Sequence, residues 1–266
     1  MTQGVLPAGS CDAHLHIIPE APETALPCYV AMRAALGLSR AVVVQAKAHG
    51  TDNTATLEAV AGLGAEARGI AVLHPGMTTA ELRRLHDGGI RGLRFSLWRP
   101  SDAVCSLEMI EPLAAAIAPL GWHVQLHLSG AQISDMEAML DRLPCPIVFD
   151  HMGRLPPAEG AAHPAFAVMA RLLQRGRAWV KLGGAYLNTD VGPPYPDASR
   201  IARALVAEAP ERLVWGTDWP HVTERDKPDD AGLLALLDEW AGSAEVRDRI
   251  LVENPAKLYG FVQSCA

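Results

Sequence analysis

The sequence of 266 residues has no excess of positive charge, no long apolar run and no start typical of a leader. Lys and Arg number 23 against 30 Asp and Glu, which gives a net charge of −7. We expect no nucleic-acid partner, because such binding depends on basic patches that contact phosphate. No apolar stretch approaches the roughly 18 residues of a membrane span, and the N-terminus lacks the basic start and apolar run of a secretory signal. We therefore expect no membrane partner and a cytoplasmic location.

Cysteine is scarce, and the motifs of several enzyme classes are missing. The five cysteines are an odd number without CxxC spacing, which predicts reduced thiols rather than a disulfide framework or a zinc knuckle. They are Cys11, Cys28, Cys105, Cys145 and Cys265. There is no G-x-S-x-G nucleophile elbow, no Walker A loop and no glycine-rich dinucleotide turn. No pattern therefore points to a serine or cysteine nucleophile, or to a nucleotide cofactor.

Short apolar runs rich in Val, Ile and Leu recur along the chain, and amphipathic stretches separate them. This alternation is typical of parallel α/β folds, and continuously apolar runs are expected for strands covered on both faces. Eight runs with no linker between halves predict a (β/α)8 TIM barrel, formed by residues 1–266 as a single domain with a C-terminal helical extension. The runs are Ser10–His16, Ala41–Ala46, Arg68–Leu73, Gly92–Leu97, Trp122–Leu128, Pro146–His151, Ala178–Gly183 and Arg212–Thr217.

Local signals predict where several helices begin and end. Thr78–Glu81 has the spacing of a capping box, and Ser134–Glu137 predicts a second box just inside the next helical stretch. The apolar periodicity near the C-terminus predicts a helix that begins near Asp229. A last helix is expected over Ala244–Glu253, followed by Asn254-Pro255 and a short tail.

Ionisable residues gather at the ends of the predicted strands, where the chemistry of a (β/α)8 barrel lies. His14 and His16 end the first run, and residues i and i+2 of a strand point to the same face. Both imidazoles can therefore approach one atom. His127, His151 and Asp218 end or follow later runs. Imidazole is a ligand of Zn and other divalent metals, so these residues together predict a metal site, with a hydrogen-bonded structural histidine pair as the alternative.

Asp218 follows an apolar run directly. A carboxylate at the mouth of an apolar barrel must be paired, bound to a metal or shifted in pKa, and each of these states suits a general base. Its alternative role is that of a helix N-cap. We discount that role, because the next helix is expected to begin only near Asp229.

Positive side chains also lie at or after strand ends. Arg94 interrupts the fourth run, and Arg99 and Arg154 follow the fourth and sixth. The guanidinium fork of Arg matches carboxylate oxygens, so this cluster predicts an anionic substrate, with internal salt bridges as the alternative. Lys47 and His49 follow the second run. With a net charge of −7, local cations would have to capture an anion that the whole protein repels.

Six blocks carry a resemblance to a known family. They are VVVQAKAHGTDN (42–53), RGLRFSLW (91–98), GWHVQLHL (121–128), DHMGR (150–154), WGTDWPH (215–221) and ENPAKLYGF (253–261). Together with the His-x-His pair, they resemble the 2-pyrone-4,6-dicarboxylate lactonase-like (amidohydrolase 2) family of the amidohydrolase superfamily. The resemblance covers nearly the whole chain and implies a hydrolase that opens a carboxylated lactone. Suitable substrates would be a 2-pyrone-4,6-dicarboxylate, a muconolactone or a sugar-acid lactone.

The resemblance also implies roles for individual residues. Asp218 would activate water, and His14, His16 and His151 would surround the lactone carbonyl. Substrate contacts would come from Arg94, Arg154 and His221, with His49, Lys47 and Arg99 as further candidates. The superfamily's ligand set maps onto His14, His16, His127 and Asp218, which would hold one divalent ion, zinc by preference. Metal-free catalysis is the alternative, because the family's dicarboxylate lactonases work without a metal and have Tyr where this chain has His127.

Two features leave the reaction open at this point. The family's Arg after the seventh strand is absent, because residues 183–188 contain no Arg, so the substrate need not be a dicarboxylate. Superfamily relatives include metal-dependent decarboxylases and lactone isomerases, which are the alternative activities. A non-enzymatic binding protein is a third alternative. The oligomeric state, monomer or homodimer, is also open.

Overall fold

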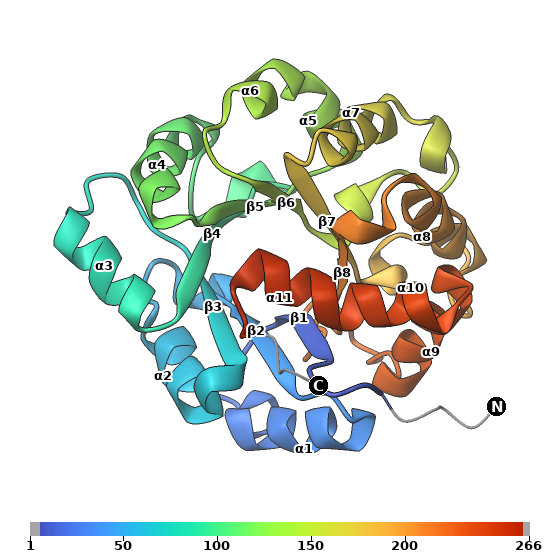
Figure 1. Ribbon diagram of the computed structural model, residues 1–266, viewed down its shortest axis with the longest axis horizontal. Helices are drawn as coiled ribbons and strands as arrows, with labels where there is room; N and C mark the ends of the chain where they lie inside the picture. The colour runs from blue at the N-terminus through green and yellow to red at the C-terminus, as the bar shows by residue number, and fades with distance from the viewer. Residues whose placement is uncertain (1–5, 263–266) are drawn as a thin grey trace.

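The computed structural model describes residues 6–262 and contains an eight-stranded parallel sheet that curls into a barrel (Figure 1). Each strand pairs with the next one along the chain. Each predicted apolar run overlaps one strand, which confirms the (β/α)8 barrel, although β2, β3 and β4 begin one or two residues before their runs. The strands are β1 (Cys11–Leu15), β2 (Arg40–Val44), β3 (Ala67–Ala71), β4 (Ile90–Ser96), β5 (His123–His127), β6 (Ile147–Phe149), β7 (Ala178–Leu182) and β8 (Leu213–Trp215).

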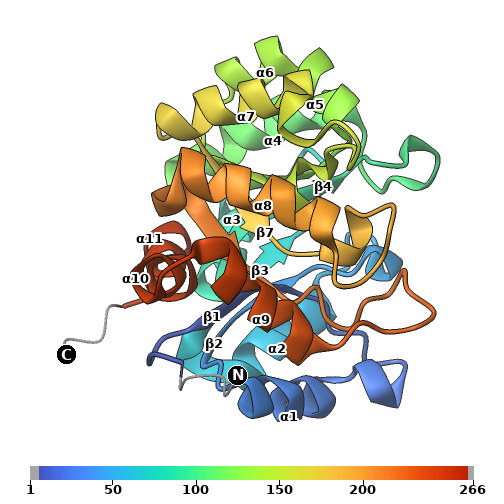
Figure 2. The ribbon, with the colours of Figure 1, turned by 90° about the vertical axis from the view of Figure 1, so that its right-hand side faces the viewer.

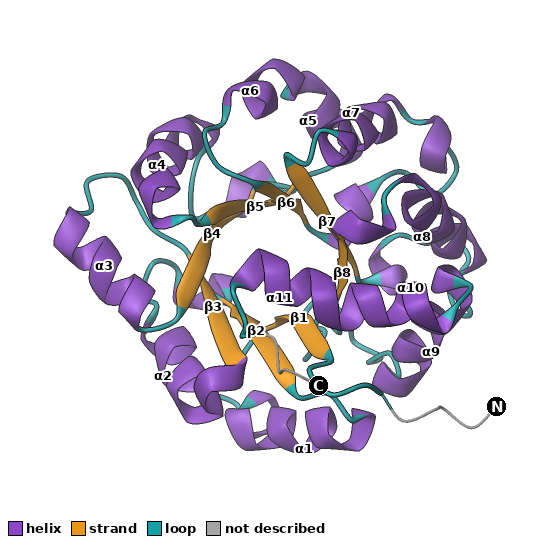
Figure 3. Ribbon diagram, in the orientation of Figure 1, coloured by secondary structure: helices purple, strands orange, loops and turns teal. Residues whose placement is uncertain are grey.

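Helices surround the strands as an outer ring (Figure 3). They bury the outer faces of the strands, which explains the many apolar residues in the strand sequences. Several strands also carry buried polar side chains, among them Asp12, Arg94 and Lys181. The helices are α1 (Leu26–Leu36), α2 (Thr54–Leu63), α3 (Thr79–Asp87), α4 (Ile110–Ile117), α5 (Gly130–Asp135), α6 (Glu137–Arg142), α7 (Pro164–Gln174), α8 (Pro196–Glu208), α9 (Asp230–Ala241), α10 (Ala244–Asp248) and α11 (Asn254–Tyr259).

The helix caps confirm one predicted capping box and correct the other. Thr78 and Glu81 form the predicted box at α3. The second box is Ser129 with Gln132, at the start of α5. Ser134 lies inside α5, where its hydroxyl donates to the carbonyl of Gly130, so the prediction for Ser134–Glu137 was wrong. An earlier serine starts the helix, and the later one bonds a carbonyl four residues back.

The seam between the first and last strands brings residues of β1 close to residues that follow β8. The amide of Asp218 donates to the carbonyl of His14 over 2.8 Å, and the amide of His16 donates to the carbonyl of Trp219 over 2.7 Å. Gly216 makes this approach possible, because a Cβ at that position would lie 2.5 Å from the His14 nitrogen. The seam therefore fixes residues of β1 beside the loop that follows β8.

The C-terminal helices cover the end of the barrel where the strands begin. Asn254 donates to the carbonyls of Pro210 and Leu213, the latter at the start of β8. The helix predicted to end at Glu253 continues through a π-helical turn into α11, because Pro255 occupies the first turn of α11, where its missing N–H is tolerated. Figure 2 shows α10 and α11 on one side of the barrel and long loops on the other. The site is thus confined to the loop side.

Two further sequence predictions concern the described part of the chain. Cys11, Cys28, Cys105 and Cys145 are free thiols, as expected, and Cys265 lies outside the described residues. Within residues 6–262, no helix has both the length and the apolar character that a membrane crossing needs.

Candidate active site

A cavity of about 260 Å³ opens where the strands end. Most of the ionisable residues predicted at strand ends line it. They are His16, Lys47, Arg94, Arg99, His127, His151 and Asp218, together with the neighbouring side chains of Trp98 and Asp102. A cavity of this size suits a small monocyclic compound, since pockets for larger, drug-sized ligands start near about 300 Å³.

Asp218 lies at the centre of three histidines. Its Oδ1 is 3.5 Å from His14 Nε2, 3.6 Å from His16 Nε2 and 4.0 Å from His151 Nε2. Asp218 and His151 both have left-handed backbones, with φ of 64° and 49°. Such strained conformations cost about 1–3 kcal/mol each and concentrate at functional sites. The chain therefore holds these groups together at a cost in stability.

Three side chains fit a divalent metal ion. The donor atoms of His14, His16 and Asp218 lie within 4.8 Å of one another. His16 Nδ1 donates to the Val44 carbonyl over 2.9 Å, which leaves the Nε2 lone pair directed at Asp218. His14 Nε2 is buried and has no hydrogen-bond partner within residues 6–262. An unsatisfied buried nitrogen beside a carboxylate and a second imidazole is the donor set that a catalytic zinc site uses.

His127 stands apart from these three. Its Nδ1 is 3.0 Å from the Ser96 hydroxyl, and its ring makes an edge contact with His151. Within the described residues, two groups have donor atoms close enough to share an ion: His14 with His16 and Asp218, and His14 with Asp150 and His151. His127 belongs to neither group. The structure thus brings together three of the four ligands expected from the sequence and leaves His127 on the cavity wall.

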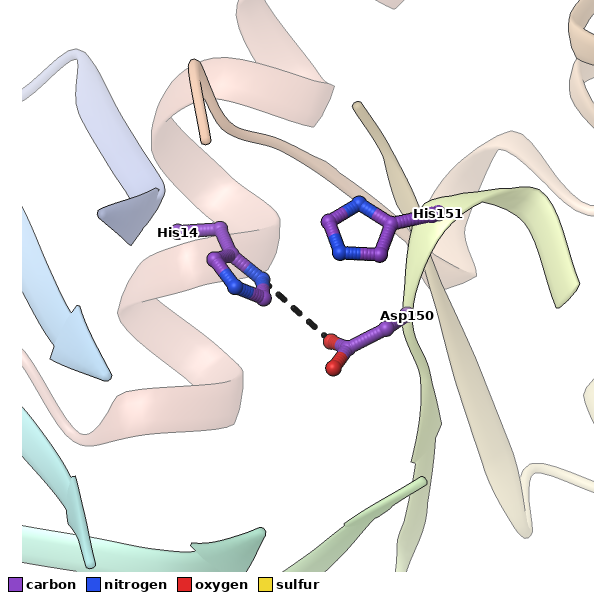
Figure 4. Close-up of side chains that lie close together, drawn as sticks. All are labelled: His14, Asp150 and His151. Atoms are coloured by element: carbon purple, nitrogen blue, oxygen red, sulfur yellow. Dashed lines mark ion pairs between the residues drawn. The ribbon is translucent and has the colours of Figure 1, made fainter. Parts of the chain in front are cut away.

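Asp150 forms a buried hub beneath the histidines (Figure 4). Its carboxylate lies 3.3 Å from His14 Nδ1 and 3.0 Å from Arg94 Nε, and it accepts from Gln125 over 3.2 Å. Lys181 lies 3.8 Å from the same carboxylate and donates to Gln125. Asp150 directly follows β6 and Lys181 lies within β7, and no sequence pattern indicates that the two are linked. The hub holds the His14 ring in place.

The buried charges shift the protonation of the site. Burial alone would raise the pKa of Asp218, but His151, His16 and His14 together hold it well below its usual range, so the carboxylate is ionised. Burial, reinforced by Lys181, keeps the pKa of His14 well below its usual range, so its imidazole is neutral. A neutral imidazole beside an ionised carboxylate is suited to metal binding and to proton abstraction alike.

The predicted cations have three kinds of partner: a buried carboxylate, an exposed carboxylate and an aromatic ring. Arg94 pairs with buried Asp150, whereas Lys47 pairs with exposed Asp102 over 2.5 Å. Arg99 and Arg154 both stack on Trp98, at 4.7 Å and 4.1 Å from its ring centre. Burial lowers the pKa of Arg154 to about 10, which leaves it charged at neutral pH.

Three predicted substrate contacts are not among the described residues that line the cavity: Arg154, which lies against Trp98, and the histidines His49 and His221. His49 pairs with Glu20 of the neighbouring loop over 3.0 Å. His221 is buried, with Nδ1 3.1 Å from the Tyr186 hydroxyl and Nε2 2.9 Å from Asp230. Within residues 6–262, neither histidine lines the cavity. Tyr186, which donates to Asp218 Oδ2 over 2.6 Å, was not predicted, because no strand-end rule covers a residue in the loop after β7.

Sequence comparison places the chain in a family. Residues 11–261 match the sequence profile described as amidohydrolase. The chain belongs to the amidohydrolase family. This confirms the family expected from the sequence blocks, over nearly the whole length of this amidohydrolase.

Several curated relatives of this amidohydrolase have names that describe lactones as their substrates. A Comamonas testosteroni protein named 2-pyrone-4,6-dicarboxylate hydrolase is 37% identical, with 96% of this chain and 91% of the relative covered. A 4-sulfomuconolactone hydrolase of Hydrogenophaga intermedia is 34% identical, with 97% and 91% covered. A D-galactarolactone isomerase of Agrobacterium fabrum is 33% identical, with 84% and 77% covered.

Solved structures agree in fold. An apo structure from Agrobacterium tumefaciens has a TM-score of 0.90 and 28% identity, covering 98% of this amidohydrolase and 96% of that chain. A putative 2-pyrone-4,6-dicarboxylic acid hydrolase from Pseudomonas putida has a TM-score of 0.84 and 28% identity, covering 97% and 100%. These proteins therefore share the overall fold of this chain.

Proposed function

We propose that this amidohydrolase hydrolyses a small lactone that carries at least one carboxylate. The observation that carries the proposal is the ionised Asp218 among three imidazoles, in a cavity that is also lined by Lys47 and Arg99. Such a cavity combines a base for water with cations for an anionic substrate. The names of the lactone-hydrolysing relatives support the same reaction class. The proposed reaction would take place in the cytoplasm, the location expected from the sequence.

In the proposed reaction, Asp218 acts as the general base. Its Oδ1 accepts a proton from water as the water oxygen forms a bond to the lactone carbonyl carbon. The bond between that carbon and the ring oxygen then breaks, and Asp218 returns the proton to the ring oxygen. The product is an open-chain hydroxy acid, whose new carboxyl group loses its proton to solvent. An N–H of His151 donates to the carbonyl oxygen while it carries negative charge.

A divalent ion would be held by His14, His16 and Asp218, and zinc suits these imidazole and carboxylate donors. When bound, it would supply Lewis-acid chemistry and a lowered pKa for water. The roles of the protein groups do not depend on it: the hub around Asp150 orients His14, and the Val44 carbonyl orients His16. In the metal-free alternative, the imidazoles alone polarise the carbonyl through N–H groups, which for His16 requires a second proton, because its Nδ1–H already donates to Val44.

The proposal is tested by proton release in a pH-stat across a panel of muconolactones, 2-pyrone dicarboxylates and sugar-acid lactones. We expect turnover of at least one carboxylated lactone and a loss of about a hundredfold to ten-thousandfold in kcat for Asp218→Asn. Asn tolerates the left-handed backbone of this position, so the variant should keep its melting temperature. Absence of turnover across the panel, with and without added zinc or manganese, would refute the proposal. Full activity after chelation would refute the metal site.

A lactone isomerase is the second candidate, because the Agrobacterium fabrum relative is named for that activity. Isomerisation consumes no water and leaves the ring closed. Turnover in water enriched in oxygen-18 separates the two reactions. Hydrolysis places the label in the product carboxylate, whereas isomerisation leaves the lactone unlabelled at its carbonyl.

A further inference from the structure

The cavity has a carboxylate at its entrance that the proposed reaction does not use. Asp102 and Asp218 are the two carboxylates among its described lining residues. Asp102 lies in the loop after β4, and its Oδ2 is 2.5 Å from the Nζ of Lys47 in the loop after β2. Arg99, which also lines the cavity, contributes to the low pKa of Asp102, after the larger effects of the Lys47 hydrogen bond and charge. Asp102 therefore sits where an anion would be stabilised.

Such a carboxylate is unexpected in a cavity that must accept an anionic substrate. Like charges repel, so Asp102 would oppose binding if it stayed beside Lys47. The pair is exposed, however, with 38% of the Lys47 side chain and 52% of the Asp102 side chain open to solvent. Exposed ion pairs contribute little to stability, so another anion can replace one partner at small cost.

Arg94 provides the contrast. Its partner Asp150 is fully buried and is also held by Gln125 and Lys181. Breaking a buried pair leaves a charge without compensation and is strongly unfavourable. Arg94 is therefore committed to the hub, whereas Lys47 is a cation that can change its partner.

We propose that Asp102 occupies a binding site for a substrate carboxylate, formed by Lys47 and Arg99, and leaves it when the substrate binds. The inference rests on the proposed function only in taking a lactone as the substrate. Asp102 is then a specificity-determining residue: it competes with the bound anion and limits affinity for substrates that bring a carboxylate to this end of the cavity. Uncharged lactones do not displace it.

The test compares a carboxylated lactone with its methyl ester in Asp102→Asn. We expect KM for the carboxylated lactone to fall by about threefold to tenfold, while its kcat changes by less than about twofold. KM for the ester should not change. In the Lys47→Met background, where the carboxylated lactone should bind more weakly, Asp102→Asn should have no effect on KM.

Asp87→Asn, at the end of α3 and just before the start of β4, lies outside the cavity lining, makes the same change in net charge and is the matched control.

A binding measurement separates this inference from the proposed function. Calorimetric titration with benzene-1,3-dicarboxylate requires no turnover, and its affinity should rise in Asp102→Asn by a similar factor. Tighter binding in a protein that hydrolyses no lactone would leave the inference standing and the function refuted. A higher KM or weaker dicarboxylate binding in Asp102→Asn would overturn the inference. An equal gain for the ester, or no dicarboxylate binding by either protein, would also overturn it.

Discussion

Tyr186 controls which oxygen of Asp218 faces the imidazoles. Its hydroxyl donates to Oδ2, so Oδ1 is the oxygen directed at His14 and His16. His221 and Asp230 hold the tyrosine from behind. A hydrogen bond to a charged group is worth about 1.5–3 kcal/mol. We therefore expect Tyr186→Phe to lower kcat by about tenfold to a hundredfold while KM changes little, as measured by steady-state kinetics on a lactone from the panel.

Tyr195→Phe is the matched control for this prediction. Tyr195 lies in the same loop region and lines a separate cavity beside Tyr186, away from Asp218. Removing its hydroxyl should leave kcat unchanged. A Tyr186→Phe enzyme with wild-type kcat would contradict the positioning role, and a lowered melting temperature would point to a structural one.

The thiols give a second prediction at this scale. Burial raises the pKa of Cys145 to about 11 and also raises that of Cys105, so neither forms a thiolate near neutral pH. Cys28 is exposed. In a Cys265→Ser variant at pH 8, a disulfide reagent that detects thiolates should titrate Cys28 rapidly and the buried thiols only after unfolding. Fast reaction of a second thiol in the native protein would contradict the burial.

The chemistry of a (β/α)8 barrel lies where its strands end, and this explains which site residues could be predicted from the sequence. His14, His16 and Asp218 each end or directly follow a strand, and the barrel brings such positions together. Tyr186 and Asp102 lie in loops, where the direction of a side chain depends on turns that no periodicity encodes. His221 follows a strand end, but its left-handed backbone (φ 56°) accompanies a ring that contacts Tyr186 and Asp230 instead of the cavity.

At the scale of elements, Asn254 anchors α11 to the barrel. Its amide donates to the carbonyl of Pro210, just before β8, and to that of Leu213, at the start of β8, and the side chain is buried. Each lost hydrogen bond would leave a carbonyl unsatisfied, at about 1–3 kcal/mol. We expect Asn254→Ala to lower the free energy of unfolding by about 2–4 kcal/mol in urea denaturation. The exposed neighbour Lys257→Ala should change it by less than about 0.5 kcal/mol, and an equal effect of both would argue against this anchor.

The elements themselves were predicted more reliably than their ends. Continuous apolar runs identify buried strands, because both faces of a strand are covered by side chains. Helix starts depend on one hydroxyl competing with another nearby, as Ser129 and Ser134 do. The continuation of the last helix past Pro255 depends on packing across the barrel end, which a local stop signal does not report.

At the scale of the whole molecule, the candidate metal site links the first strand of the barrel to the loop after the last strand. His14 and His16 belong to the first strand and its end, whereas Asp218 follows the last strand. An ion bound by all three therefore holds the seam closed and stabilises only the folded chain. Binding at a free concentration of 100 times Kd contributes about 2.7 kcal/mol. For a chain of this size, we expect added zinc to raise the melting temperature by about 5–10 °C, and a chelator to reverse the rise.

Calorimetric scans of two histidine variants decide whether the rise comes from the seam. His16→Ala removes a ligand and should abolish the response to zinc. His74→Ala removes an exposed histidine, whose ring nitrogen lies 3.1 Å from a backbone carbonyl, and should keep the response in full. Equal responses of the two variants would place the zinc elsewhere. If the unaltered chain does not respond to zinc, manganese or a chelator, the seam is held by hydrogen bonds alone, and Asp218 with its imidazoles must activate water without an ion.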